Sequence, residues 1–505
     1  MILHQPELLA LLADRHPDAV AWKNLADGSE LTVGDWHARS NQLGRGLLQR
    51  GIGPGARVGL AITEDEPLQW LVSYMAVHAM GAVAVPLNTR LSAPEVARTV
   101  RHAEVSALLG SEVVLAGQPE ISAHIALVAT TGNTGASHMR WSELFAEDGS
   151  DIGHPITDDD VADIMYTSGT TGAPKGVVVR HGGLSATDRV PDAWLGLGFM
   201  TSSPFSTTSG SLLVCGPMRG GMSGWFLPKF DAARWCAMVA SQRPVAAFLV
   251  PAMVNLIVAL PESASVDLSS LVVVNIGSAP IARETLRRFG ELLPSANLMC
   301  GYGLTEFGAV TAMPMNDRGR HLGSAGVPLP GVELRVLDTN ESVLPHGAVG
   351  QIAIGGARVQ RTYLGNSAST GETWKDGWLH SGDLGYVDAD GFLWIVGRQK
   401  EMIIRGGHNV IPGEVEAALC AHPHVVDAAV AGIPHGVLGE DVVAWVVVSP
   451  NDMTSVEAIR GFLRERLADY KVPRRITLVE QLPRNEAGKV LKGKLVADQK
   501  QRSAP

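Results

Sequence analysis

Two apolar spacings alternate along the first 330 residues, and this alternation restricts the fold more than any other feature of the chain. Apolar residues recur at helical spacing over 33–48 and 67–80, which predicts helices. The short, mainly apolar runs at 57–62 and 82–86 have the length of buried strands. Strands and helices that alternate in this way predict mostly parallel sheets covered by helices. We therefore expect a large α/β N-terminal domain.

The pattern changes near residue 331. Segments 332–337 and 350–355 alternate apolar and polar residues with a period of two, and turn residues lie between them. This period is typical of strands that place one face on a core. We expect a small, β-barrel-like antiparallel unit over about 331–397.

The remainder of the chain is a compact mixture of helix and strand patterns. The spacing predicts helices at 412–421 and 456–470 and a strand at 442–448. A chain of 505 residues is also too long for a single hydrophobic core. We expect an N-terminal domain over 1–399 and a small, mobile α+β domain over 400–505.

Composition excludes several classes of protein. The net charge of −10 argues against a sequence-independent nucleic-acid binder, which needs a basic face. The chain has no basic, apolar leader and no uncharged apolar stretch near the ~18 residues of a membrane span. Its four cysteines form no CxxC motif and fit reduced thiols, so we expect a cytoplasmic protein. Peripheral membrane contact and a homodimer remain open.

A loop rich in glycine, serine and threonine follows the apolar run at 161–166. The sequence YTSGTTGAPKG at 166–176 offers backbone N–H groups and hydroxyls to phosphate oxygens, and its glycines allow close approach. It is not a Walker A loop, because Pro174 precedes Lys175 and Gly176 follows it. A flexible linker is the alternative, but linkers rarely lie between two apolar runs.

Four further motifs follow in order: GYGLTE at 301–306, HSGD at 380–383, GRQKEMI at 397–403 and PRNEAGK at 483–489. With the loop, this ordered set resembles the acyl-adenylate-forming enzymes: acyl-CoA synthetases, adenylation domains of peptide synthetases and luciferases. The resemblance extends from about residue 10 to 495. It implies that ATP activates a carboxylic acid as acyl-AMP, and that a thiol, here CoA, then displaces AMP.

The resemblance also implies roles for individual residues. Lys489 bridges the incoming carboxylate and the α-phosphate, Thr305 contacts the α-phosphate, and Glu306 with Thr170 holds Mg²⁺, a hard cation suited to oxygen ligands. The implied ATP and AMP site consists of Thr167, Ser168, Gly169, Thr170, Thr171, Gly172, Lys175, Gly277, Ser278, Ala279, Pro280, Tyr302, Gly303, Asp383 and Arg398. Within it, Tyr302 stacks on adenine, and Asp383 and Arg398 bind the ribose.

The acyl pocket and the small domain are read in the same way. The resemblance places Phe205, Ser206, Ser209 and Gly308 at the acyl pocket and Arg405, Gly406 and Gly407 on the path of CoA. It makes Lys400 the hinge between two orientations of the small domain. Relatives often have histidine where this chain has Ser206, and amino-acid-activating domains have aspartate there. A free α-amino acid is therefore an unexpected substrate, because its ammonium would lack a partner. Arg405 is a second departure, since many relatives have serine there.

We therefore expect an AMP-forming acyl-CoA synthetase for a hydrophobic carboxylic acid, whether fatty, aryl or ring-derived. Two alternatives remain open. One is an acyl-AMP ligase or adenylation enzyme that loads a carrier protein. The other is a catalytically silent adenylate-binding homologue, against which the presence of Lys489, Glu306, Asp383 and Arg398 argues.

Overall fold

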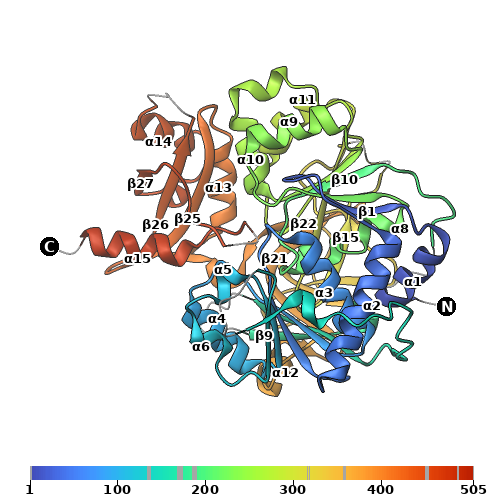
Figure 1. Ribbon diagram of the computed structural model, residues 1–505. Helices are drawn as coiled ribbons and strands as arrows, with labels where there is room; N and C mark the ends of the chain where they lie inside the picture. Colours follow the sequence, from blue (N-terminus) through green and yellow to red (C-terminus); the bar gives the residue numbers. More distant parts are fainter. Residues whose placement is uncertain are drawn as a thin grey trace.

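The structure of the protein is a computed structural model that describes residues 3–132, 138–167, 175–184, 190–315, 317, 319–356, 360–449, 454–485 and 488–503 (Figure 1). A large N-terminal α/β domain is followed by a smaller C-terminal α+β domain, as the sequence predicts. Figure 1 shows the small domain, in orange and red, beside helices α10 (Pro251–Ala259) and α11 (Arg283–Leu292). Among the described residues, no helix combines the length and the apolar character needed to cross a bilayer.

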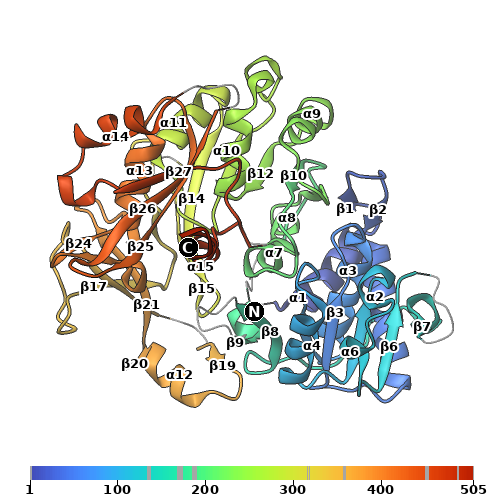
Figure 2. The ribbon, with the colours of Figure 1, turned by 90° about the vertical axis from the view of Figure 1, so that its left-hand side faces the viewer.

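An eight-stranded sheet forms the first part of the large domain. In sheet order its strands are β19 (Thr362–Tyr363), β9 (Lys175–Arg180), β8 (Val161–Thr167), β4 (Val83–Pro86), β3 (Arg57–Ala61), β5 (Ala107–Gly110), β6 (Leu127–Thr130) and β7 (Met139–Arg140). Pairs from β8 to β7 are parallel, whereas β9 and β19 are antiparallel to their neighbours. Figure 2 shows β6 and β7 at the edge of the molecule away from the small domain.

Both faces of this sheet are covered, which explains its mainly apolar strands. On β5, Ala107 and Leu109 pack into one core and Leu108 into another on the opposite face. The helices on the two faces are α2 (Val33–Gln49) and α3 (Pro67–Ala79) on one, and α4 (Ala93–His102), α5 (Glu112–Leu115) and α6 (Pro119–Ser122) on the other. The predicted helices and strands of this region are therefore confirmed to within two residues at either end.

A nine-stranded sheet forms the second part. Its order is β16 (Val327–Pro328), β15 (Gly308–Ala312), β14 (Asn297–Leu304), β13 (Val273–Ile276), β12 (Ala246–Leu249), β10 (Gly198–Thr201), β11 (Ser223–Phe226), β1 (Val20–Asn24) and β2 (Glu30–Thr32). Strands β14 to β1 are parallel neighbours. Helices α9 (Ala232–Gln242), α10 and α11 cover one face. On the other face, α1 (Gln5–Arg15), α2 and α3 share one core with both sheets and so lie between them.

An antiparallel sheet follows, as the period-two segments predict. Its order is β17 (Glu333–Leu337), β18 (Gly350–Gly355), β21 (Trp378–Val387) and β20 (Trp374–Lys375), with β22 (Leu393–Arg398) paired to β21 and α12 (Ser367–Thr373) before β20. Ile352, Ile354 and Leu379 pack against the β14–β15 hairpin. One short segment departs from this unit: β19 joins the eight-stranded sheet through β9.

The small domain is a five-stranded sheet with helices on both faces. Its strands are β24 (His408–Val410), β23 (Ile403–Arg405), β26 (Gly439–Val448), β25 (Val425–His435) and β27 (Arg475–Leu478), and its helices are α13 (Pro412–Cys420), α14 (Val456–Arg464) and α15 (Lys492–Ser503). The predicted helix at 456–470 is too long. Helix α14 ends at Arg464. Leu467, and Tyr470 of the 3₁₀ turn η5 (Asp469–Lys471), then pack against the same core as α14.

Candidate active site

A cavity of about 1030 Å³ lies where the two large sheets meet the small domain. Its walls come from the carboxyl ends of β8, β12 and β13, from the β14–β15 hairpin and from the segment 206–217. Ligands of open α/β sheets bind outside the carboxyl ends of the strands, so this position is expected. Arg484, Asn485 and Leu491 of the small domain also line the cavity.

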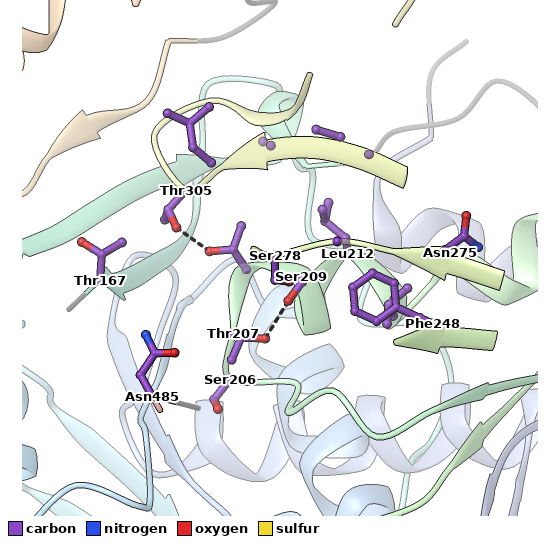
Figure 3. Close-up of a pocket in the computed structure, with 18 of the residues that line it drawn as sticks. Thr167, Ser206, Thr207, Ser209, Leu212, Phe248, Asn275, Ser278, Thr305 and Asn485 are labelled. Atoms are coloured by element: carbon purple, nitrogen blue, oxygen red, sulfur yellow. Dashed lines mark hydrogen bonds between the residues drawn. The ribbon is translucent and has the colours of Figure 1, made fainter. Parts of the chain in front are cut away.

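The cavity brings together several of the predicted nucleotide and acyl residues. Those on its walls are Thr167, Ser206, Ser209, Gly277, Ser278, Tyr302, Gly303, Thr305 and Gly308. Figure 3 shows Thr167 and Thr305 toward one side and Phe248 and Asn275 toward the other. Ser168, Gly169, Thr170, Thr171 and Gly172 lie outside the described residues. Thr167 and Lys175 are cross-strand partners on β8 and β9, so the loop between them connects neighbouring strands.

Thr305 and Glu306 lie in the three-residue turn that joins β14 to β15. Gly308, with φ of +105°, closes the turn, as glycine often does in hairpins of this length. Thr305 Oγ1 is 2.7 Å from Thr208 Oγ1 of α7 (Thr208–Leu213). Phe307 stacks on Trp374, with ring centroids 6.2 Å apart. The backbone of the turn is thus anchored while Thr305 faces the cavity.

Tyr302 and Asp383 form a bonded pair at the cavity wall. The Tyr302 hydroxyl donates to Asp383 Oδ2 at 2.6 Å, and Arg398 Nε donates to Oδ1 at 2.7 Å. Asp383 and Arg398 are cross-strand partners on β21 and β22. Burial and the Asp383 charge hold the pKa of Tyr302 well above its usual value, so the phenol stays protonated. Each Asp383 oxygen keeps a lone pair for a further donor.

The backbone after β13 passes close to the same wall. Gly277 and Ser278 line the cavity, and Ser278 has φ of +75°, a conformation that serine rarely adopts. Ala279 and Pro280 follow it and do not line the cavity among the described residues. Strained backbone of this kind is common where a chain is shaped around a ligand.

Lys489 approaches from the small domain without lining the cavity itself. Its Nζ is 3.8 Å from Glu401 Oε1, and its side chain is 41% exposed. Burial of the ammonium and the positive charge of Arg398 lower its pKa, while Glu401 opposes this shift. Lys400 lies beside it in the 3₁₀ turn η4 (Gln399–Glu401), and burial and Arg398 lower its pKa as well.

Only some of the predicted acyl-pocket residues line the cavity. Ser206 and Ser209 line the cavity, and Ser209 Oγ is 3.2 Å from Thr207 Oγ1. Phe205 does not line it: the ring is 4% exposed and stacks on Phe226, edge-on to Trp22, in the core between the sheets. The apolar part of the wall is built from other residues, namely Phe199, Leu212, Leu213, Pro217, Met222, Phe248, Met299 and Met313.

The predicted CoA residues lie on the small domain and do not line the cavity. Gly406 and Gly407, both at positive φ, form the turn between β23 and β24. Arg405 is bound within its own domain: Nε is 2.9 Å from Asp441 Oδ1, and Nη1 donates to the Tyr470 carbonyl at 2.7 Å.

Comparisons with known proteins give the family. The AMP-binding enzyme family matches residues 10–364, and the AMP-binding enzyme C-terminal domain matches 414–489. The chain belongs to the AMP-binding enzyme family. The resemblance seen in the motifs is therefore confirmed, and with it the enzyme class, an AMP-forming acid–thiol ligase that uses ATP and CoA.

Individual relatives of this AMP-binding enzyme cover nearly the whole chain. A feruloyl-CoA synthase of an Amycolatopsis species is 34% identical over 483 residues, 93% of this chain and 94% of the relative. The fatty acid–[acyl-carrier-protein] ligase ScoC of Streptomyces coeruleorubidus is 32% identical over 521 residues, 98% and 97% of the two chains. The crystal structure of ATP-bound MatB from Rhodopseudomonas palustris superposes with a TM-score of 0.87 at 30% identity, covering 99% and 100%.

Sequence reasoning missed three residues of this AMP-binding enzyme's site. Thr208 contacts Thr305, Arg361 donates to the Thr305 carbonyl at 2.8 Å, and the Tyr363 hydroxyl donates to Glu306 Oε1 at 2.8 Å. Arg361 directly precedes β19 and Tyr363 lies in it. Because side chains alternate along an extended segment, residues two apart lie on one face. That spacing was the available signal, but it does not reveal what the face contacts.

The described residues contain no group of three or more His, Cys, Asp and Glu side chains that could hold a metal ion. Glu306 offers a single carboxylate for a metal ion. One of its oxygens, Oε1, already accepts a hydrogen bond from the Tyr363 hydroxyl. This donor set fits Mg²⁺, which is usually held by one or two carboxylates together with substrate phosphates.

All four cysteines are buried thiols: Cys215, Cys236, Cys300 and Cys420. Cys300, on β14, lines the cavity and is 9% exposed. Burial raises its pKa to about 12.

Proposed function

We propose that this enzyme activates an uncharged aryl monocarboxylic acid, of the hydroxycinnamate type, as its acyl-AMP and transfers the acyl group to CoA. The observation that supports the proposal is one continuous cavity. It joins the predicted adenine wall, with Gly277 and Tyr302, to an apolar end with Leu212 and Phe248. Of the related proteins above, the feruloyl-CoA synthase has the highest identity, and the acid in its name, ferulate, belongs to this class.

In the first half-reaction, a carboxylate oxygen attacks the α-phosphorus of ATP. A new oxygen–phosphorus bond forms, the bond to the β-phosphate oxygen breaks, and pyrophosphate leaves. The protein must stabilise charge on the phosphorus oxygens and hold the acid in line. We assign these tasks to Thr305 at the α-phosphate and to Lys489 between the two reactants.

The remaining nucleotide contacts follow the same proposal. Lys175 and the loop before it hold the outer phosphates, and Asp383 and Arg398 bind the ribose. Glu306, with Thr170, would hold Mg²⁺, which would neutralise charge on the phosphates when bound. Tyr302, kept rigid and protonated by Asp383, presents its ring to adenine.

In the second half-reaction, the CoA thiolate attacks the acyl carbonyl, a carbon–sulfur bond forms, and AMP leaves. We propose that the domain boundary lies at Lys400 and that the small domain turns there between the two steps. This turn would bring Gly406 and Gly407 to the cavity, where their lack of a side chain lets the pantetheine arm pass close to the backbone. We retain Arg405 on this path through its backbone, because its guanidinium is bound to Asp441.

The walls of the cavity support an uncharged acyl group. Among the described residues, the charged side chains on its lining are Arg90, Glu95, Arg98 and Arg484, which come from the 90–98 segment and the small domain. Asn275 supplies an amide beside Phe248 (Figure 3), so an aryl acid with one hydrogen-bonding substituent suits the apolar end better than a saturated fatty chain. Ser206 offers no charge to an α-ammonium, whose burial costs several kcal/mol.

The test is a panel of acids with ATP, Mg²⁺ and CoA, read out as product mass and pyrophosphate release. Ferulate, 4-hydroxycinnamate, cinnamate, hexanoate and phenylalanine form the panel. We expect the hydroxylated cinnamates to react fastest and phenylalanine to be slower by about a thousandfold or more. Fastest pyrophosphate release with phenylalanine or hexanoate would refute the acid class.

The acceptor is tested in parallel with a phosphopantetheinylated carrier protein in place of CoA. Faster loading of the carrier than of CoA would favour the alternative that the ScoC relative represents. A cytoplasmic location and a homodimer also remain proposals, and the location is supported by the four reduced, buried thiols.

A further inference from the structure

The segment 361–363 leaves the antiparallel unit and reaches the Thr305–Phe307 turn. β19 pairs with β9, the strand that begins at Lys175, and the Leu364 N–H donates to the Gly176 carbonyl at 2.7 Å. The backbone of this segment is therefore fixed to the strand that follows the predicted phosphate loop. The side chains at its two ends, Arg361 and Tyr363, extend to the turn.

Arg361 holds the backbone of the turn. The side chain is 4% exposed, Nη1 donates to the Thr305 carbonyl at 2.8 Å, and Nη2 donates to the Gly183 carbonyl at 2.7 Å. A Cβ at Gly308 would lie 3.0 Å from Nη2, so the guanidinium also fits closely against the end of the turn. One planar group thus connects the turn to the segment after β9.

Two carboxylates, the buried Asp163 and the partly buried Glu306, balance the charge of Arg361. Burial lowers its pKa to about 10, and the negative charges of Asp163 and Glu306 oppose that shift. Arg361 therefore remains protonated at neutral pH. Asp163 is itself fixed, because it accepts from the Tyr74 hydroxyl at 3.0 Å and lies 2.9 Å from His78 Nε2. A neutral side chain in place of Arg361 would leave the negative charges of these carboxylates uncompensated.

Tyr363 holds the carboxylate of the turn. Its hydroxyl donates to Glu306 Oε1 at 2.8 Å, and Lys175 Nζ lies 5.1 Å from the centre of its ring. A hydrogen bond to a charged acceptor fixes orientation more strongly than a neutral one. Tyr363 therefore sets the direction of Glu306 relative to the lysine at the end of the predicted phosphate loop.

We propose that Arg361 and Tyr363 are positioning residues for acyl-adenylate formation, which fix the Thr305–Glu306 turn relative to Lys175. Neither residue needs to touch a substrate. Arg361 sets where the Thr305 backbone lies, and Tyr363 sets where the Glu306 carboxylate points. The inference rests on the proposed function, because that proposal assigns Thr305 to the α-phosphate and Glu306 to Mg²⁺.

The experiment uses the full chain with Tyr363→Phe and Arg361→Lys, each of which keeps most of the side chain. Pyrophosphate release is measured against MgATP concentration. Thioester formation is measured separately from CoA and the synthetic acyl-AMP of the best acid in the panel. Hydrogen–deuterium exchange of the 301–312 peptide reports the turn without any substrate. The matched controls are Tyr470→Phe in the small domain and Arg335→Lys, whose guanidinium lies over Trp378.

We expect Tyr363→Phe to raise the KM for MgATP roughly tenfold. Arg361→Lys should lower kcat for pyrophosphate release by about tenfold to a hundredfold and speed exchange in the 301–312 peptide. Both variants should form thioester from acyl-AMP within about twofold of the wild-type rate, and the two controls should match wild type in every assay.

Two results would overturn the inference. One is unchanged pyrophosphate release and exchange in both variants. The other is an equal loss of both half-reactions with a lower melting temperature, which indicates a purely structural role. Thr305→Ala and Glu306→Gln separate this inference from the proposed function. If those two variants keep normal pyrophosphate release, the roles assigned to the turn are wrong, and the inference is overturned with them.

Discussion

Two regions reach the same cavity in different ways: the Thr305–Phe307 turn of the large domain and the 484–491 segment of the small domain. The turn is held by Thr208, Arg361, Tyr363 and the Phe307–Trp374 stack. The ammonium of Lys489 is held less closely than the turn. Lys489 Nζ is 3.8 Å from Glu401 Oε1, and the Lys489 side chain is 41% exposed. The neighbouring Gly488 lies against Val250 of the large domain.

The difference indicates a division of labour. Groups that stabilise developing charge work best when they are already in place, which describes the turn. A group that must leave between two half-reactions cannot be buried deeply, because each departure would then cost much free energy. The following variants test whether Lys489 serves the first half-reaction only and whether the small domain must turn before the second.

Lys489→Ala should have the largest effect. Loss of a cation that stabilises charge in the transition state should slow pyrophosphate release by about a hundredfold to a thousandfold. Thioester formation from synthetic acyl-AMP and CoA should be spared, because we assign Lys489 to the first half-reaction. Both rates are measured on the same sample. Lys494→Ala, an exposed lysine on α15, is the matched control. Equal loss of both half-reactions would remove the division.

Lys400→Pro should have the next largest effect. Proline fixes φ near −65°, which suits the 3₁₀ turn η4 as it stands here but not a second backbone conformation. Thioester formation should therefore slow by about tenfold or more while pyrophosphate release is kept. Lys400→Ala, which leaves the backbone free to turn, should retain both steps. If the rates of both half-reactions fall by the same factor in the proline variant, or if neither rate changes, the hinge lies elsewhere between Gly397 and Arg405.

Glu401→Gln should have the smallest effect, visible in the pH dependence. The Glu401 carboxylate favours the charged form of Lys489 and so raises its pKa. Its removal lowers that pKa, so the ammonium is lost at lower pH. Because the first half-reaction needs the ammonium, the alkaline limb of pyrophosphate release should move to lower pH.

Glu416→Gln is the control for this variant. Glu416 pairs with Lys492, 2.8 Å away, and does not contact Lys489 among the described residues. The pH profile of that variant should match wild type. A Glu401→Gln profile that does not move, or that moves to higher pH, would show that Glu401 has no electrostatic hold on Lys489.

The sequence predicted the two-domain α/β and α+β architecture, because long alternating patterns report burial directly. The resemblance of its motifs also implied that Thr167, Gly277, Tyr302 and Thr305 belong to one site, and all four line the cavity. These motifs did not show that Asp383 and Arg398 would be cross-strand partners, since pairing between strands depends on register.

The contacts of Phe205, Arg361 and Tyr363 were beyond such reasoning. Phe205 directly precedes Ser206 of the cavity wall, but its ring turns into the aromatic core between the sheets. Arg361 precedes β19 and Tyr363 lies in it, and a two-residue strand is too short for a recognisable pattern. The partners of these two residues in the turn are 56 and 57 residues away in sequence. Tertiary packing decides such contacts, and local spacing does not encode it.

The burial of Cys300 bears on whether the enzyme could be acylated by its own intermediate. In the proposed reaction, a reactive mixed anhydride forms in the cavity that Cys300 lines, where any thiolate would compete with CoA for the acyl group. Because burial raises the pKa of Cys300 to about 12, its sulfur stays protonated and weakly nucleophilic at neutral pH. The protein can therefore hold its activated intermediate without acylating itself, and the acyl group waits for the external thiol.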